Sequence, residues 1–120
     1  MLDYRDMDTV FQALANESRR RMLDIVKDQP GIAVGVLASE FDVSRIAVMK
    51  HLAVLEEADL VVSEKRGRTR RLYFNAVPIQ MIHERWTTEY SAYWAGQLTN
   101  IKYIAETRHR DNESGGKQSK

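Results

Sequence analysis

Five cationic side chains crowd one short stretch of the chain, which reads SEKRGRTRRLYF over Ser63–Phe74. They are Lys65, Arg66, Arg68, Arg70 and Arg71. Segment 64–71 therefore holds five positive charges and one negative charge, whereas the whole chain has a net charge of +1. Such a patch either binds an anionic partner such as phosphate, or is a solvated hairpin whose charges prevent edge-to-edge strand pairing.

A second group of candidate contacts lies in 44–57. Ser44 is a good N-cap for a helix that reaches about Ala58. At about 100° per residue, one face of this helix is apolar and the opposite face carries Ile46 and Lys50. The side chains that could contact DNA near its N-terminal end are Ser44, Arg45, Ile46, Ala47, Met49, Lys50 and His51.

These residue types suit different parts of a DNA groove. Arg45 and Lys50 can bind phosphate or the edge of guanine, and exposed Ile46 and Met49 can pack on thymine methyl groups. Ile46 could instead pack against the preceding helix. His51 points nearer the core face, where it would be a packing residue or a phosphate donor rather than a catalyst.

Helices before this segment must hold it in place. Asp8 could cap a first helix that buries Val10, Phe11 and Leu14 on its inner face, and Asn16 could cap a second helix that ends at Pro30-Gly31. A third short helix covers the apolar residues of 36–41 and ends in a tight turn at Asp42-Val43. This turn and the helix after it predict a helix-turn-helix.

The basic stretch follows as a hairpin. LVVSEK and RRLYFN read as strands, with RGRT as the loop in which Gly67 allows positive φ. A cationic hairpin directly after a helix-turn-helix is a candidate wing, so we assign Lys65, Arg66, Arg68 and Arg70 to DNA binding. The sequence thus predicts a mainly α fold with a β-hairpin wing, a dimeric winged helix-turn-helix.

A last helix is predicted from Ile79 to Glu106, with Pro78 in its first turn. It would be roughly 40 Å long, whereas a body of this size is about 35 Å across. Its apolar stripe would therefore form a dimer seam with the first helix, or alternatively a pocket for a small molecule. The residues assigned to this dimer interface are Phe11, Trp86, Tyr90, Tyr93, Trp94 and Ile101. The chain then divides into a domain of 1–106 and a disordered tail of 107–120.

Composition excludes several classes of protein. With 43% apolar and 29% charged residues, the chain is expected to be a globular protein of the cytoplasm, with no signal peptide and no membrane span. The absence of cysteine excludes disulfides and thiolate zinc sites. Three scattered histidines without Ser/His/Asp spacing give no catalytic constellation, so neither an enzyme nor a cofactor is expected.

Together these motifs resemble the ArsR/SmtB type of winged-helix repressor. The likeness covers about Val10 to Ile104 and includes ALANESRRRMLDIV and the stretch that ends in RGRTRRLYF. The positions that match the family pattern are Ala13, Leu14, Arg20, Arg21, Leu23, Leu37, Ala38, Ser44, Val48, His51, Leu52, Leu55, Ala58, Leu60, Val61, Gly67, Arg68, Leu72 and Tyr73. The resemblance implies a bacterial homodimer that binds an inverted repeat in promoter DNA, usually as a repressor.

The chain departs from the family pattern in two respects. Asp59 stands where the family usually has glycine. Metal-sensing members carry a cysteine pair on the third helix, where this chain has Val36–Ser39, or two ligand pairs on the last helix, where only His83 and Glu84 are present. The chain therefore resembles the metal-free branch. A protein-interaction module without DNA binding and a small-molecule-sensing regulator remain the alternatives.

Overall fold

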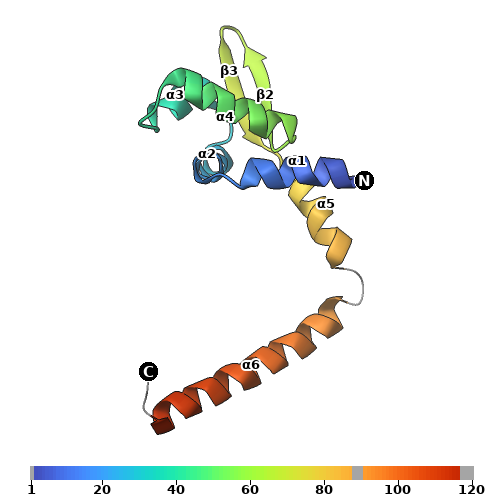
Figure 1. The fold of residues 1–120 in the computed structure, drawn as a ribbon. Coiled ribbons are helices and arrows are strands. Elements are labelled where there is room, and N and C mark those ends of the chain that lie inside the picture. Colours follow the sequence, from blue (N-terminus) through green and yellow to red (C-terminus); the bar gives the residue numbers. More distant parts are fainter. Residues whose placement is uncertain (1, 88–90, 117–120) are drawn as a thin grey trace. The chain divides into compact units, whose positions relative to one another are not determined.

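The protein is described here by a computed structural model of residues 2–87 and 91–116, with side chains described for 2–87 and 96–108. The chain separates into two units, 1–84 and 85–120. The elements are α1 (Tyr4–Leu14), α2 (Glu17–Asp28), β1 (Ile32–Ala33), α3 (Val34–Ser39), α4 (Arg45–Glu57), β2 (Val61–Arg66), β3 (Thr69–Phe74), α5 (Val77–Trp86) and α6 (Ser91–Gly116). In the first unit, the β2–β3 hairpin rises above α1 and α2, and α5 leads away from the base of the hairpin (Figure 1).

Helix α1 begins earlier than expected. Its N-cap is Asp3, not Asp8, because Asp3 Oδ1 accepts from the amide of Asp6 at 2.7 Å. The Asp6 carboxylate accepts in return from the amide of Asp3 at 3.3 Å, which completes a capping box. Asp8 is instead an exposed residue within the helix.

Helix α2 confirms the predicted cap, and the sheet adds a strand that the sequence did not predict. Asn16 Oδ1 accepts from the amide of Arg19 at 3.0 Å. After α2, Gly31 has a φ of +85° and its amide donates to the Leu72 carbonyl at 2.8 Å. The two residues of β1 then pair antiparallel with β3, which gives the sheet order β1-β3-β2.

One apolar core holds the first unit together. It lies between α1, α2, α3, α4 and the sheet, and its fully buried side chains include Met22, Leu37, Leu52, Leu55 and Leu72. Burying a side chain of this size stabilises the fold by about 1.5–3 kcal/mol, before the entropy of ordering it is counted. Both the helix-turn-helix and the hairpin are thus attached to the same core.

The expectation of one last helix from Ile79 to Glu106 is wrong. Helix α5 ends at Trp86, Thr87 is not helical, and α6 begins at Ser91. Thr87 is β-branched and has a lower helix propensity than Glu84 and Arg85 before it, which favours a break here. Helix α6 continues to Gly116, so the first ten residues of the expected disordered tail (107–120) are helical. No helix of the described part of the chain is long and apolar enough to cross a membrane.

Asp59 occupies a backbone conformation that favours glycine. Its φ is +60°, in the left-handed region. Its amide donates to the Glu56 carbonyl at 3.0 Å, and the Leu60 amide donates to the Leu55 carbonyl at 3.0 Å. These two bonds make a Schellman motif, in which glycine is the usual residue at the position of Asp59. The family's glycine is therefore replaced here without loss of the helix-to-strand turn.

We expect Asp59→Gly to raise the free energy of unfolding by about 0.5 kcal/mol, because relief of the left-handed strain exceeds the added entropy of the unfolded chain. Asp59→Ala should lower it by about 1 kcal/mol, since alanine tolerates this φ less well than aspartate. Urea unfolding at one fixed protein concentration measures both. Asp59→Asn is the control for the loss of charge, and an unchanged stability in Asp59→Ala would contradict the strain argument.

Candidate nucleic-acid interface

Helices α3 and α4 form the helix-turn-helix, and residues 40–44 connect them. Ser44 Oγ accepts from the amide of Ala47 at 3.1 Å and fixes the start of α4, as predicted. Val48, Leu52 and Leu55 are buried, and their burial turns the opposite face of α4 outward. Ser44 itself is exposed.

Helix α4 is here called the reading helix. Its outward face carries apolar Ile46 and cationic Lys50, as predicted. Ile46 is 70% exposed, so it does not pack against α3. Arg45 and Lys50 are also exposed. Met49 is half-buried and packs against the core, which leaves less of it for a base contact than the sequence indicated. Ala47 is half-buried on the flank.

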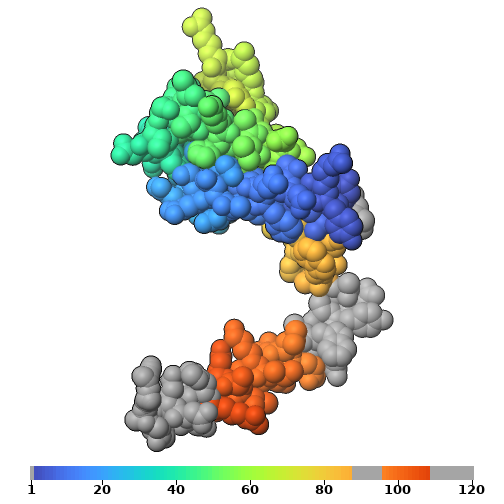
Figure 2. Space-filling model, in the orientation of Figure 1, coloured from blue at the N-terminus to red at the C-terminus, as the bar shows by residue number. Residues whose placement is uncertain are grey.

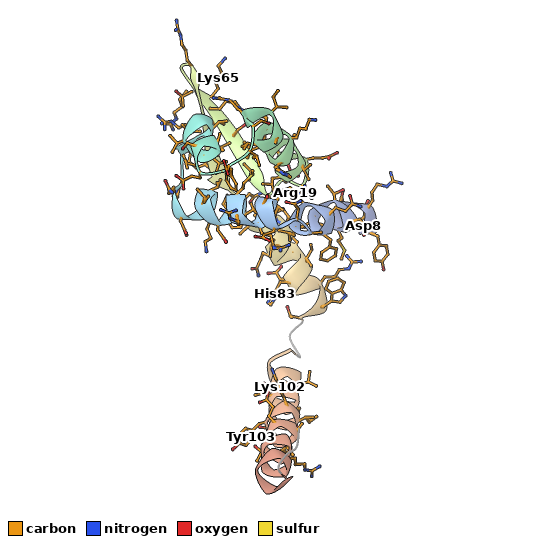
Figure 3. The ribbon with its side chains drawn as sticks, turned by 60° about the vertical axis from the view of Figure 1, so that its left-hand side comes forward. Asp8, Arg19, Lys65, His83, Lys102 and Tyr103 are labelled. Carbon is orange, nitrogen blue, oxygen red and sulfur yellow. The ribbon has the colours of Figure 1, made fainter. Side chains whose placement is uncertain are left out.

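The β2–β3 hairpin, here called the wing, projects from the body. Its strands pair in register from Val61 opposite Phe74 to Arg66 opposite Thr69, so Gly67 and Arg68 form a two-residue loop. Gly67 has a φ of +63° and Arg68 has a negative φ, the pattern of a type II′ turn. Figure 2 shows the yellow-green tip reaching beyond the rest of residues 1–84. Lys65 lies near this tip (Figure 3).

The five cations of the wing differ in their partners. Within the part of the chain whose side chains are described, Lys65 and Arg68 are exposed and make no ion pair. Arg66 donates through Nε to Glu64 Oε1 at 2.6 Å, and this hydrogen bond and the Glu64 charge raise the pKa of its guanidinium. Arg71 points the other way and donates to the Gly31 carbonyl at 3.3 Å.

Arg70, which the sequence grouped with the DNA contacts, is held against the reading helix. Its Nη2 donates to both carboxylate oxygens of Glu56 at 2.7 Å and to Ser63 Oγ at 3.0 Å. Arg70 lies on the same face of β3 as buried Leu72, two residues further along. The alternation of residues along β3 therefore predicts that Arg70 faces the same side as the core, but its partner on α4 could not be identified from sequence alone.

His51 faces inward and contacts α2. Arg19 Nη1 lies 3.2 Å from His51 Nδ1, and because a guanidinium has only donors, Nδ1 can only be the acceptor in this contact. Arg19 also donates to the carbonyls of Ala13 and Gln12, each at 2.9 Å. These carbonyls belong to the last turn of α1, where backbone donors are scarce, although the Gln12 carbonyl also accepts from the Ala15 amide at 3.2 Å. Arg19, which the sequence did not single out, thus joins α1, α2 and α4.

The residues assigned to dimerisation are only partly described. Phe11 on α1 is 44% exposed, Trp86 at the end of α5 is 64% exposed, and Ile101 on α6 is 62% exposed. Tyr90 lies outside the described residues, as do the side chains of Tyr93 and Trp94. Among the described residues, no three His, Cys, Asp or Glu side chains converge as metal ligands would.

Comparison with known proteins agrees with this geometry. A family model described as a helix-turn-helix domain matches residues 14–64. The chain is 36% identical over 111 residues to the HTH-type transcriptional regulator Rv2034 of Mycobacterium tuberculosis, covering 92% of this chain and 99% of that relative. It is 27% identical over 74 residues to the transcriptional repressor SdpR of Bacillus subtilis, covering 62% and 81%. An ArsR-like transcriptional regulator from Rhodococcus sp. RHA1 has a similar structure, with a TM-score of 0.63 and 32% identity, covering 85% of this chain and 94% of that one.

The three contacts of the Arg19 guanidinium lead to a prediction about stability. Arg19→Lys should lower the free energy of unfolding by about 1–2 kcal/mol, because one ammonium cannot serve two carbonyls and an imidazole in this arrangement. Arg20→Lys is the matched control, since Arg20 is exposed and makes one bond, to the Leu14 carbonyl at 2.8 Å. Urea unfolding compares the two variants. An equal decrease in the free energy of unfolding for both would show that the contacts of Arg19 do not stabilise the fold more than the single bond of Arg20.

Proposed function

The chain belongs to the ArsR-like family of helix-turn-helix transcriptional regulators, and we propose that it is a homodimeric repressor of an inverted-repeat site in double-stranded DNA. The observation that carries the proposal is a surface in two parts. Exposed Ile46, Arg45 and Lys50 on the reading helix can meet base edges and phosphates. Lys65 and Arg68 on the wing, which make no ion pair within the residues whose side chains are described, can follow the DNA backbone. The sites proposed to contact DNA are Ser44, Arg45, Ile46, Ala47, Met49, Lys50, Lys65, Arg66 and Arg68.

The two parts would contribute differently to binding. Phosphate contacts supply affinity that depends on salt but carry no direct sequence information, whereas contacts to base edges distinguish sequences. His51 is turned toward Arg19, so its contribution would be to fix the reading helix. Repression, rather than activation, is supported by the similarity to SdpR, a transcriptional repressor.

A dimer is supported by the apolar surface of the second unit. Within its described side chains, α6 exposes Leu98, Ile101, Tyr103 and Ile104 by 50–64%. An isolated helix is marginally stable in water and has no core in which to bury such residues. A second copy of the chain would cover them. Because two copies related by a two-fold axis bind two half-sites, the DNA site would be an inverted repeat.

The alternatives make different predictions. A protein-interaction module of the same fold would show no salt-dependent DNA binding. A small-molecule sensor would need a pocket, and the aromatic residues suggested for it, Tyr90, Tyr93 and Trp94, lie outside the described side chains. We propose no catalytic activity, because the residues that point outward from the helix-turn-helix and the wing are those of a binding surface.

The division of the DNA surface can be tested with duplexes selected from a random library. Arg68→Ala should weaken binding to a selected and a scrambled duplex alike and make the salt slope shallower by about one unit. Ile46→Ala should leave the salt slope unchanged and relax preference at one or two base pairs by about 1 kcal/mol. Fluorescence anisotropy at several salt concentrations measures both.

Lys27→Ala is the control for the loss of one exposed cation. Lys27 lies with Leu14, Phe74 and Ile79 around a hollow at the base of the wing, away from its tip. The salt slope of Lys27→Ala should equal that of the parent protein. If Arg68→Ala also kept the parental slope, the wing would be a solvated hairpin rather than a DNA contact.

The dimer seam can be tested on α6. Ile101→Glu should convert the dimer to a monomer, because a carboxylate buried in an apolar seam without a partner costs several kcal/mol. Asn100→Glu adds the same charge at a neighbouring exposed position and should leave the dimer intact. Sedimentation equilibrium decides, and an unchanged dimer in Ile101→Glu would place the seam elsewhere.

We also propose that the regulator does not respond to metal. Micromolar zinc or cadmium should leave both the melting temperature and DNA binding unchanged, since a ligand that binds only the native state must stabilise it. A zinc-dependent rise in melting temperature that His83→Ala abolishes would refute this proposal.

A further inference from the structure

The contact between Glu56 and Arg70 joins the two elements of the DNA surface. Glu56 lies in the last turn of α4, and Arg70 lies on β3. Both carboxylate oxygens accept from one guanidinium nitrogen at 2.7 Å, and Ser63 on β2 accepts from the same nitrogen at 3.0 Å. The pair therefore bridges the reading helix and both strands of the wing.

The charges around this pair explain why it forms. A carboxylate in the last turn of a helix faces the negative end of the helix dipole, and Glu57 is its neighbour in sequence. Across the hairpin, Arg70 stands directly opposite Lys65, a like charge on the same face of the sheet. The pair relieves both unfavourable arrangements, because Arg70 neutralises Glu56 and Glu56 reduces the repulsion of Arg70 from Lys65.

An ion pair with a carboxylate makes a cation of the wing less available to bind a DNA phosphate. The Arg70 side chain is 38% exposed and that of Glu56 27% exposed, so the pair is only partly open to water. A phosphate that bound Arg70 through Nη2 would have to displace a carboxylate that holds this nitrogen through two contacts, and Glu56 already offsets the charge of the guanidinium. Lys65 and Arg68 have no such competitor within the described part of the chain. Arg66 has one in Glu64, but both side chains are more than half exposed, at 68% and 51%.

We propose that Glu56 and Arg70 are positioning residues, which fix the angle between wing and reading helix and so set the specificity of DNA binding without contacting phosphate. This inference rests on the proposed function. With the pair intact, the wing cations meet the backbone only where Ile46 and Lys50 meet the correct bases. With the pair broken, the wing can bind phosphate in several registers, which helps any sequence.

Four variants separate this role from a phosphate contact, each titrated against a selected and a scrambled duplex at several salt concentrations. Arg70→Gln should keep the parental salt slope and lower the ratio of the two affinities about fivefold, the equivalent of ~1 kcal/mol for one partly exposed ion pair. Arg68→Gln, the same exchange on the same hairpin, should make the slope shallower by about one unit and keep the ratio.

Glu56→Gln gives the opposite sign. It removes the competitor of Arg70, so the salt slope should become steeper by about one unit and the scrambled duplex should bind more tightly. The double variant Glu56→Gln/Arg70→Gln should lower the affinity ratio no further than Arg70→Gln alone, because both single changes break one contact. Thermal melting of each variant confirms that the folded protein is being titrated.

Two results would overturn the inference. One is a slope in Arg70→Gln as shallow as that of Arg68→Gln, which would make Arg70 a phosphate contact. The other is an affinity ratio in Arg70→Gln equal to that of the parent. If the parental protein showed no salt-dependent binding to either duplex, the proposed function itself would fail, which is a different outcome from these two.

Discussion

Burial of one face of α4 is the constraint on which the rest of the structure depends. Val48, Leu52 and Leu55 enter the same core as Leu60 and Val61 at the start of the wing and Leu72 in its second strand. A helix can bury only one stripe, so the residues opposite that stripe must face outward. The same packing brings β2 beside α4, which places the wing and the exposed face of the reading helix in one part of the molecule. Exposed Ile46 is thus a consequence of buried Leu52.

Local sequence patterns predicted most of this arrangement. Asn16 and Ser44 cap the helices predicted to follow them, and Gly67 takes the positive φ expected of its loop. Each of these caps and turns depends on a few neighbouring residues, so a short stretch of sequence is enough to predict it. The winged helix-turn-helix fold and its family follow from the order of these elements. The errors at α1 and at Thr87 are also local, since two aspartates competed as caps and one continuous apolar stripe concealed a helix break.

Contacts between distant segments could not be predicted in this way. The two-residue strand β1 exists because β3 supplies its partners. Ile32 pairs with Leu72 and Ala33 pairs with Arg71, which lie 40 and 38 residues further along the chain. The sequence identified the cations of the wing but not their partners. Whether a charge faces DNA or the protein depends on which face of a strand it occupies and on what packs there. Arg70 and Arg71 are neighbours in sequence, yet one pairs with α4 and the other with the carbonyl of Gly31.

The loop at Gly67 has a property that concerns chemistry outside the genetic code. A Cβ atom added at this glycine would meet nothing within 4 Å, so the position requires glycine for its φ of +63° and not for space. Positive φ is the ordinary range of a residue of opposite handedness. A D-amino acid at 67 would keep the type II′ turn and would reduce the freedom of the unfolded chain, which glycine increases. The wing tip is therefore a place where a synthetic side chain can be attached beside the proposed DNA-binding surface without disturbing the core.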